Sequence, residues 1–207
     1  MLDLNSMIVP GQQAGYTIQV GNAINDKGQI AATGIVTASG EQHALLLSPA
    51  NVAPTVQPAY AGTVGTNGWY RSPVTLSWTV AGLPAPTTVG CGATTVTADT
   101  KGRVFTCTAT NSVGIATQSV TVKVDKVAPQ VAITSPQVSA ERTYSRNQVF
   151  LAKYSCSDLT SGVASCVGSV ANGTRVSTST AGTYNFVVTA TDKAGNTATK
   201  TVVYRVR

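Results

Sequence analysis

The sequence predicts an all-β fold, with two tandem β-sandwiches preceded by a short three-stranded β segment. Apolar residues alternate with Thr and Ser in several runs, and this period of two is typical of strands packed on one face. No stretch shows a sustained 3.6-residue apolar period, which argues against helices. The C-terminal parts of two segments also match at an offset of 81 residues, a length that suits one small sandwich per repeat.

The repeat fixes the predicted domain organisation. Residues 100–124 align with residues 180–206 when Asn111 is placed on Asp192. The stretch "DKVAP" (125–129) lies between the two copies, and its proline restricts the strand end that precedes it. The predicted domains are therefore 1–53, 54–126 and 127–207.

Each repeat contains runs in which every second residue is apolar. These runs predict strands with one face toward a core, and "TNSVG" (110–114) and "TDKAG" (191–195) predict hairpins between the last two strands of each repeat. The expected inward residues are Val74, Leu76, Trp78, Val80, Phe105, Cys107, Ala109, Val120, Val122, Val124, Tyr184, Phe186, Val188, Ala190, Val202, Tyr204 and Val206.

The N-terminal segment differs from the two repeats. Residues 15–49 predict three short strands with turns at Asn25–Gly28 and Ala38–Gly40. Three strands need a partner to bury one face, so this segment is expected to be one unit of a larger assembly. The start, "MLDLNSMIVP", lacks the pattern of a signal peptide, and we expect the chain to be a piece of a longer precursor.

Charge and hydropathy exclude two classes of protein. The formal net charge is +6, but the 14 Lys and Arg residues are scattered singly, whereas nucleic-acid binders cluster them on one face. We therefore expect a mildly basic surface and no nucleic-acid partner. No apolar run approaches the roughly 18 residues that a membrane span needs, so none is predicted.

The first segment resembles the HAF-type extracellular repeat of bacteria. The resemblance covers about 45 residues and lies in "AINDKGQI" (23–30) and "HALLL" (43–47), where Leu45 replaces the usual Phe. Such repeats come in arrays of propeller-like blades, so the resemblance implies that residues 1–53 are a blade-like fragment.

The other two segments resemble bacterial Ig-like domains of secreted and surface proteins. The matching stretches are "GWYRSPVTLSW" (68–78), "FTCTATNSVG" (105–114), "YSCSDLTSGVASC" (154–166) and "TATDKAGN" (189–196). In the first copy, "TNSVG" departs from the commoner acidic turn. The resemblance implies an Ig-like β-sandwich with an extracellular role as spacer, adhesion or accessory module, and no catalytic residues.

The four cysteines fall two to a repeat, as Cys91 with Cys107 and Cys156 with Cys166. Zinc sites and redox pairs usually bring cysteines two to four residues apart, and no C-x-x-C occurs here. An even count within each repeat indicates disulfides in an oxidising compartment. The second pair predicts a stapled loop at the edge of the second sandwich.

Two aspartates are candidates for a metal. Asp158 lies between Cys156 and Cys166, and Asp192 lies in the last hairpin. Each offers one carboxylate with hydroxyls or an amide nearby, whereas calcium wants several converging oxygens. The default interpretation is that each caps its own turn, and a calcium site with carbonyls from between the domains is the alternative. No other cofactor or metal is expected.

Catalysis is not predicted. His43 is the only histidine, and no G-x-S-x-G occurs to pair with it, so we expect an ordinary strand residue. Trp69 and Tyr70 are adjacent, so on a strand they point to opposite faces. An exposed ring would stack on a sugar, and the competing interpretation is packing against the end of the sandwich.

These observations predict a non-catalytic extracellular structural, adhesion or spacer module of a secreted or surface-attached bacterial protein. The alternative is a carbohydrate-binding accessory module of a secreted hydrolase. The expected partner is a surface glycan or a protein ligand, and the fragment is expected to be monomeric.

Overall fold

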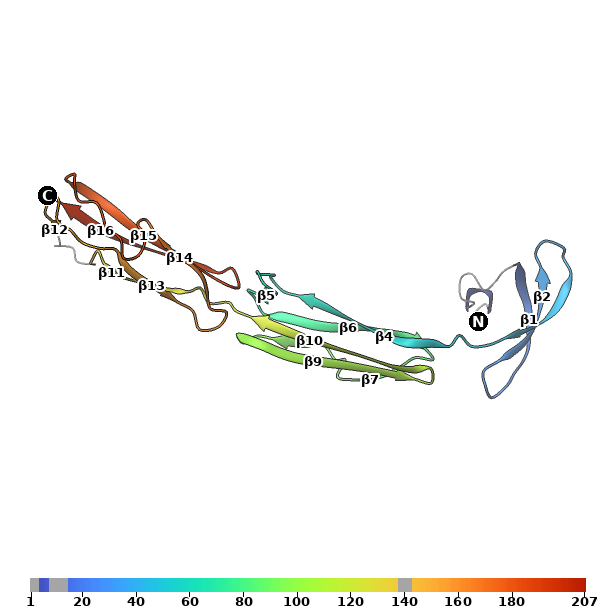
Figure 1. The fold of residues 1–207 in the computed structure, drawn as a ribbon. Helices are drawn as coiled ribbons and strands as arrows, with labels where there is room; N and C mark the ends of the chain where they lie inside the picture. Colours follow the sequence, from blue (N-terminus) through green and yellow to red (C-terminus); the bar gives the residue numbers. More distant parts are fainter. Residues whose placement is uncertain (1–3, 8–14, 138–142) are drawn as a thin grey trace. The chain divides into compact units, whose positions relative to one another are not determined.

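The computed structural model describes residues 4–7, 15–137 and 143–207. Within these ranges the chain folds into strands, with one short 3₁₀ helix, η1 (Leu4–Met7), and no α-helix (Figure 1). The predicted all-β class is confirmed. The strands form five sheets, of three, three, four, two and four strands.

The N-terminal sheet consists of β1 (Tyr16–Ile24), β2 (Ile30–Val36) and β3 (Gln42–Leu47), paired antiparallel in that order. The three predicted strands and both predicted turns are present. At the first turn the Asn25 carboxamide oxygen accepts hydrogen bonds from the amides of Lys27 and Gln29, and Gly28 has a φ of 72°. At the outer edge of β1, Asn5 donates to the Ile18 carbonyl and accepts from its amide.

The first sandwich, the name used here for β4 to β10, is made of two sheets. One is β4 (Val52–Ala61), β6 (Val74–Leu83) and β8 (Thr94–Val96), in that order. The other is β5 (Trp69–Tyr70), β10 (Gly114–Val124), β9 (Thr100–Asn111) and β7 (Thr87–Val89). Val74 and Val96 from the first sheet pack with Val122 and Val124 from the second, so the two sheets enclose a core.

The second sandwich is formed by β11 to β16. Its small sheet pairs β11 (Gln130–Ser135) with β13 (Lys153–Ser157). Its larger sheet is ordered β12 (Thr143–Tyr144), β16 (Thr197–Val206), β15 (Gly182–Asp192) and β14 (Val163–Gly168). The buried residues that fill the space between them are Ile133, Ala152, Val176, Phe186, Val188, Val202, Tyr204 and Val206.

Aromatic rings close one end of this core. Tyr144 and Phe150 stack with ring centroids 4.0 Å apart, and Tyr204 meets both edge-on. Burial raises the pKa of Tyr204 above its ordinary value, and the neighbouring Tyr184 and Tyr144 raise it further. The phenol of Tyr204 therefore stays protonated to a higher pH than an exposed tyrosine.

Twelve of the seventeen inward residues predicted from alternation are buried, and the other five are half-buried: Trp78, Val80, Phe105, Val120 and Tyr184. Val74, Leu76, Cys107, Ala109, Phe186 and Val188 are all buried. The strand β4 was not predicted, because Pro54 and Pro58 interrupt its pattern and proline is disfavoured inside a sheet. It lies at the edge of its sheet, where a missing amide donor is tolerated.

Contacts between residues divide the chain into two compact units. The first comprises residues 1–57, 79–89 and 107–118, and the second comprises residues 58–78, 90–106 and 119–207. These units do not follow the predicted domain boundaries, which remain predictions. The groups described below lie within the second unit.

Candidate metal centre

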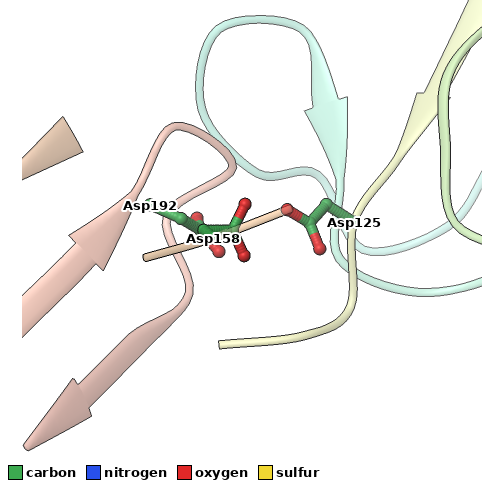
Figure 2. Close-up of side chains that lie close together, drawn as sticks. All are labelled: Asp125, Asp158 and Asp192. Carbon is green, nitrogen blue, oxygen red and sulfur yellow. The ribbon is translucent and has the colours of Figure 1, made fainter. Parts of the chain in front are cut away.

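Three aspartates converge at the ends of three strands. Asp125 follows β10, Asp158 follows β13, and Asp192 is the last residue of β15. One carboxylate oxygen from each lies within 4.8 Å of the others. Asp125 and Asp192 are buried and Asp158 is half-buried. Figure 2 shows these three side chains, called here the carboxylate cluster, lying together.

Backbone amides orient the carboxylates of Asp125 and Asp158. The Asp125 oxygens accept hydrogen bonds from the amides of Val127 and Ser161, at 3.1 and 2.9 Å. One oxygen of Asp158 accepts from the amides of Thr160 and Gly162, at 3.2 and 2.7 Å. The loop of Asp158 is therefore tied directly to Asp125 through Ser161.

Asn196 fixes the third carboxylate. Its amide and its side-chain nitrogen donate to the two oxygens of Asp192, at 2.8 and 2.9 Å. The same side-chain nitrogen lies 3.0 Å from the carbonyl oxygen of Asp125. One asparagine thus holds the last hairpin against the seam, the name used here for residues 125–129.

The hairpin of Asp192 also contacts residues on either side of β5. The Thr66 hydroxyl and the Asn67 side chain donate to the Lys193 carbonyl, at 2.7 and 3.0 Å. The Thr66 amide donates to the Ala194 carbonyl at 3.0 Å, and Arg71 reaches the Gly195 carbonyl at 3.3 Å. Three successive carbonyls of the hairpin are therefore satisfied by residues 66–71. We call these contacts the joint.

Gly65 allows this close approach. A Cβ atom at position 65 would collide with the Ala194 carbonyl oxygen and would lie 3.1 Å from the Trp69 carbonyl oxygen. Both neighbours are backbone atoms, which cannot swing aside. The joint therefore depends on glycine at this position.

The electrostatics of the carboxylate cluster favour a cation. Among the described residues, the ion pairs join Lys126 to Asp99 and His43 to Glu41, and neither involves the cluster. Three like charges this close repel one another, and burial weakens the screening by water. The Lys193 ammonium lies 3.8 Å from where a Cβ on Gly162 would be, in the loop of Asp158, and it forms no ion pair with any of the described residues.

The donor set decides which ion fits. Calcium takes six to eight oxygen ligands, including mono- or bidentate carboxylates, in a flexible geometry. Three carboxylates from three separate loops offer up to six such oxygens. Magnesium demands a stricter octahedron, and zinc prefers the nitrogen and sulfur ligands that this cluster lacks. The residues present fit calcium best.

The sequence predicted two members of this cluster and missed the third. Asp158 and Asp192 each cap their own turn, as the default interpretation expected. They also come together, whereas the calcium alternative had used either one of them with carbonyls from between the domains. Asp125 was missed because it was taken as part of a connecting seam. The sequence feature that could have identified Asp125 is its position as an acidic residue directly after the last strand of the first repeat.

The predicted disulfides are confirmed. Cys156 in β13 is bonded to Cys166 in β14, with Cα atoms 5.9 Å apart. Cys91 and Cys107 are also disulfide-bonded, and the described residues contain no free cysteine. The stapled loop lies at an edge, as predicted, because β13 and β14 are each an outermost strand of their own sheet. The bond therefore crosses the second sandwich and ties its two sheets together.

Neither aromatic candidate is exposed. Trp69 is 8% exposed, and the Lys123 ammonium lies over its ring, 5.3 Å from the centroid. Tyr70 is half-buried and stacks on Tyr60, which is 42% exposed. Burial raises the pKa of Tyr70, and Tyr60 raises it further. The structure therefore shows Trp69 packed and Tyr70 half-buried, and in the stacked pair of tyrosines Tyr60 is the more exposed ring.

His43 lies in β3, and its side chain is 46% exposed. Its Nε2 atom lies 4.0 Å from a carboxylate oxygen of Glu41. Its ring also meets Tyr16 edge-on at 5.9 Å. These contacts agree with the expectation that His43 is an ordinary strand residue. No helix in the described part of the chain has the length and apolar character of a membrane span.

Comparisons with known proteins give similarities of fold only. The sequence matches no protein-family model and no curated protein. Among solved structures, the eight N-terminal Ig domains of Down Syndrome Cell Adhesion Molecule align over 96% of this chain and 31% of that one, with 14% identity and a TM-score of 0.49. A titin Ig tandem, A164-A165, aligns over 76% of this chain and 98% of that one, with 15% identity and a TM-score of 0.31. The chain spans about a third of the length of the first of these.

Proposed function

We propose that this chain is a non-catalytic structural, adhesion or spacer module of a secreted or surface-attached bacterial protein. The two tandem sandwiches are Ig-like, and the N-terminal sheet is an HAF-type segment. The module works mechanically. It keeps a region attached to one of its ends at a fixed position relative to its other end.

The observation that carries the proposal is the joint. A flexible linker exposes its backbone and makes few contacts across it. Here Thr66, Asn67 and Arg71 satisfy three successive carbonyls of the 192–196 hairpin. Such contacts resist bending at the seam, which is what a spacer needs.

Two further features support an extracellular role. Two disulfides persist only where the surroundings are oxidising, as outside the cell. The carboxylate cluster lies beside the joint, and we propose that it binds calcium, which is abundant outside cells. Calcium bound there would tie the seam to both the Asp158 loop and the last hairpin.

Replacing Gly65 tests the joint. In Gly65→Val, the new side chain collides with the Ala194 carbonyl, and we expect the hairpin to separate from residues 66–71. The Thr66 amide, which donates to Ala194, should then exchange with solvent at least about tenfold faster, a loss on the order of 1.4 kcal/mol of protection.

Gly92→Val is the matched control, because a Cβ at position 92 meets nothing within 4 Å. The Val122 amide should stay protected in both variants, which shows that the first sandwich remains folded. A Thr66 amide that exchanges equally fast in the wild-type protein and in Gly65→Val would show that the joint does not form.

A further inference from the structure

A small polar pocket lies on the second sandwich, remote from the carboxylate cluster. Its volume is about 230 Å³, and it is lined by Asn147, Arg175, Ser177, Thr178 and Ser179. These residues belong to the turn after β12 and to the segment that precedes β15. None of them takes part in the joint or the disulfides.

The walls of this pocket are held by hydrogen bonds between its two segments. The Asn147 amide donates to the Thr178 carbonyl at 3.0 Å, and the buried Thr178 hydroxyl donates to the Gln148 carbonyl at 2.7 Å. Arg175 donates to the Asn147 carbonyl at 3.4 Å, and Arg146 donates to the Ser179 carbonyl at 3.2 Å. Hydrogen bonds between the two segments therefore hold the pocket in shape without a ligand.

The pocket presents donors more than acceptors. A guanidinium carries five N–H donors, and Arg175 and Arg146, both exposed, each use one in the bonds above. The hydroxyls of Ser177 and Ser179 lie 3.2 Å apart at the same rim. An anionic, hydroxyl-rich ligand would satisfy this set of groups.

Strand pairing places the backbones of two further arginines, Arg205 and Arg207, at this end of the sandwich. The Arg146 amide donates to the Arg207 carbonyl, and Arg205 lies opposite Thr183 at the start of β15. The acidic residues described between 143 and 207 are Asp158 and Asp192, both in the carboxylate cluster. Asp192 ends β15, so about 30 Å of strand, at roughly 3.3 Å per residue, separates the cluster from this end.

We propose that the pocket, together with Arg146 beside it, binds an acidic polysaccharide. Arg175 and Arg146 pair with a carboxylate or sulfate group, and Asn147 with the two serines bonds the sugar hydroxyls. The volume is below the roughly 300–1,000 Å³ of pockets that enclose drug-sized ligands, which suits one charged sugar unit of a chain. Single-stranded nucleic acid is disfavoured, because the lining residues include no aromatic ring for a base to stack on.

This inference goes beyond the proposed function and does not depend on it, because neither the joint nor calcium is involved. It adds an anionic glycan as the chemical class of partner at one end of the module.

Binding of the full chain to three immobilised polymers tests the inference. The polymers are polygalacturonate, dextran sulfate and neutral dextran. We expect binding to one or both acidic polymers and none to dextran. Binding to polygalacturonate alone would indicate that Arg175 pairs with a carboxylate. Binding to dextran sulfate alone would indicate that Arg175 pairs with a sulfate.

Two variants locate the site. Arg175→Gln should weaken binding at least tenfold, because it removes the charge and the fork of donors at once. Lys200→Gln removes the same charge from an exposed position in the middle of β16 and should change the affinity less than twofold. A second variant, Arg146→Gln, replaces the arginine beside the pocket and should also weaken binding.

Three results would overturn the inference. The first is no binding to either acidic polymer. The second is an equal loss in Arg175→Gln and Lys200→Gln, which would indicate only the general positive field of the protein. The third is displacement of the polysaccharide by single-stranded DNA at lower concentration, which would assign the surface to nucleic acid.

Discussion

Removing the Cys156–Cys166 disulfide is expected to lower the free energy of unfolding of the second sandwich by about 3 kcal/mol. The bond closes a separation of 10 residues and links strands of two different sheets. In its absence the unfolded chain gains conformational freedom, and both half-buried side chains lose part of their packing against the core. Urea unfolding of Cys156→Ala/Cys166→Ala measures the effect.

The matched control is Ser155→Ala/Ser165→Ala, at exposed neighbouring positions on the same two strands. Its free energy of unfolding should lie within about 0.5 kcal/mol of the wild-type value. An unchanged stability in the cysteine variant, or two reactive thiols in the unreduced wild-type protein, would show that the bond is absent in solution.

Calcium is expected to stabilise the protein by about 2.7 kcal/mol when its free concentration is a hundred times its dissociation constant. It neutralises three carboxylates that otherwise repel one another inside the fold. Thermal unfolding in calcium and in EDTA measures the difference, and calorimetric titration gives the dissociation constant.

Asp158→Asn separates the charge from the hydrogen bonds. The amide oxygen of Asn can still accept from the backbone amides of Thr160 and Gly162, so the loop keeps its bonds. In EDTA this variant should be as stable as the wild type or more stable, because one of three repelling charges is gone. In calcium the variant should lose most of the stabilisation, so the wild type should be the more stable of the two only when calcium is present.

Asp26→Asn, in the exposed turn of the N-terminal sheet, is the control with the same change of charge. It should respond to calcium as the wild type does. An identical melting temperature of the wild-type protein in EDTA and in calcium would leave the carboxylates as turn caps only.

Alternation along the sequence was enough to predict the long strands β6, β9, β10, β15 and β16, but not the shorter strands β8 and β11, which also supply core residues. In β15, Phe186 and Val188 are buried where the period of two placed them, and Val122 and Val124 of β10 are buried in the same way. This works because residues two apart on a strand share a face whatever lies opposite. The strand β4 escaped, since Pro54 and Pro58 obscure the same pattern.

The candidate metal centre depends on features that a local pattern does not contain. Asp125, Asp158 and Asp192 come from three separate parts of the chain, and only the pairing of strands brings their ends together. Likewise, the role of Trp69 follows from Lys123 covering its ring, a contact set by the pairing of β5 with β10. Sequence reasoning identified the right residue types but could not place their partners.

The central claim is that the joint fixes the orientation of the two sandwiches across the seam. Residual dipolar couplings of the weakly aligned full chain test this claim most directly. The two sets to compare are the amides of residues 58–78 and 90–106 and the amides of residues 130–137 and 143–206. We predict that one alignment tensor fits both sets in the wild-type protein and that Gly65→Val requires two. Two tensors of different magnitude in the wild-type protein, in the presence of calcium, would contradict the account.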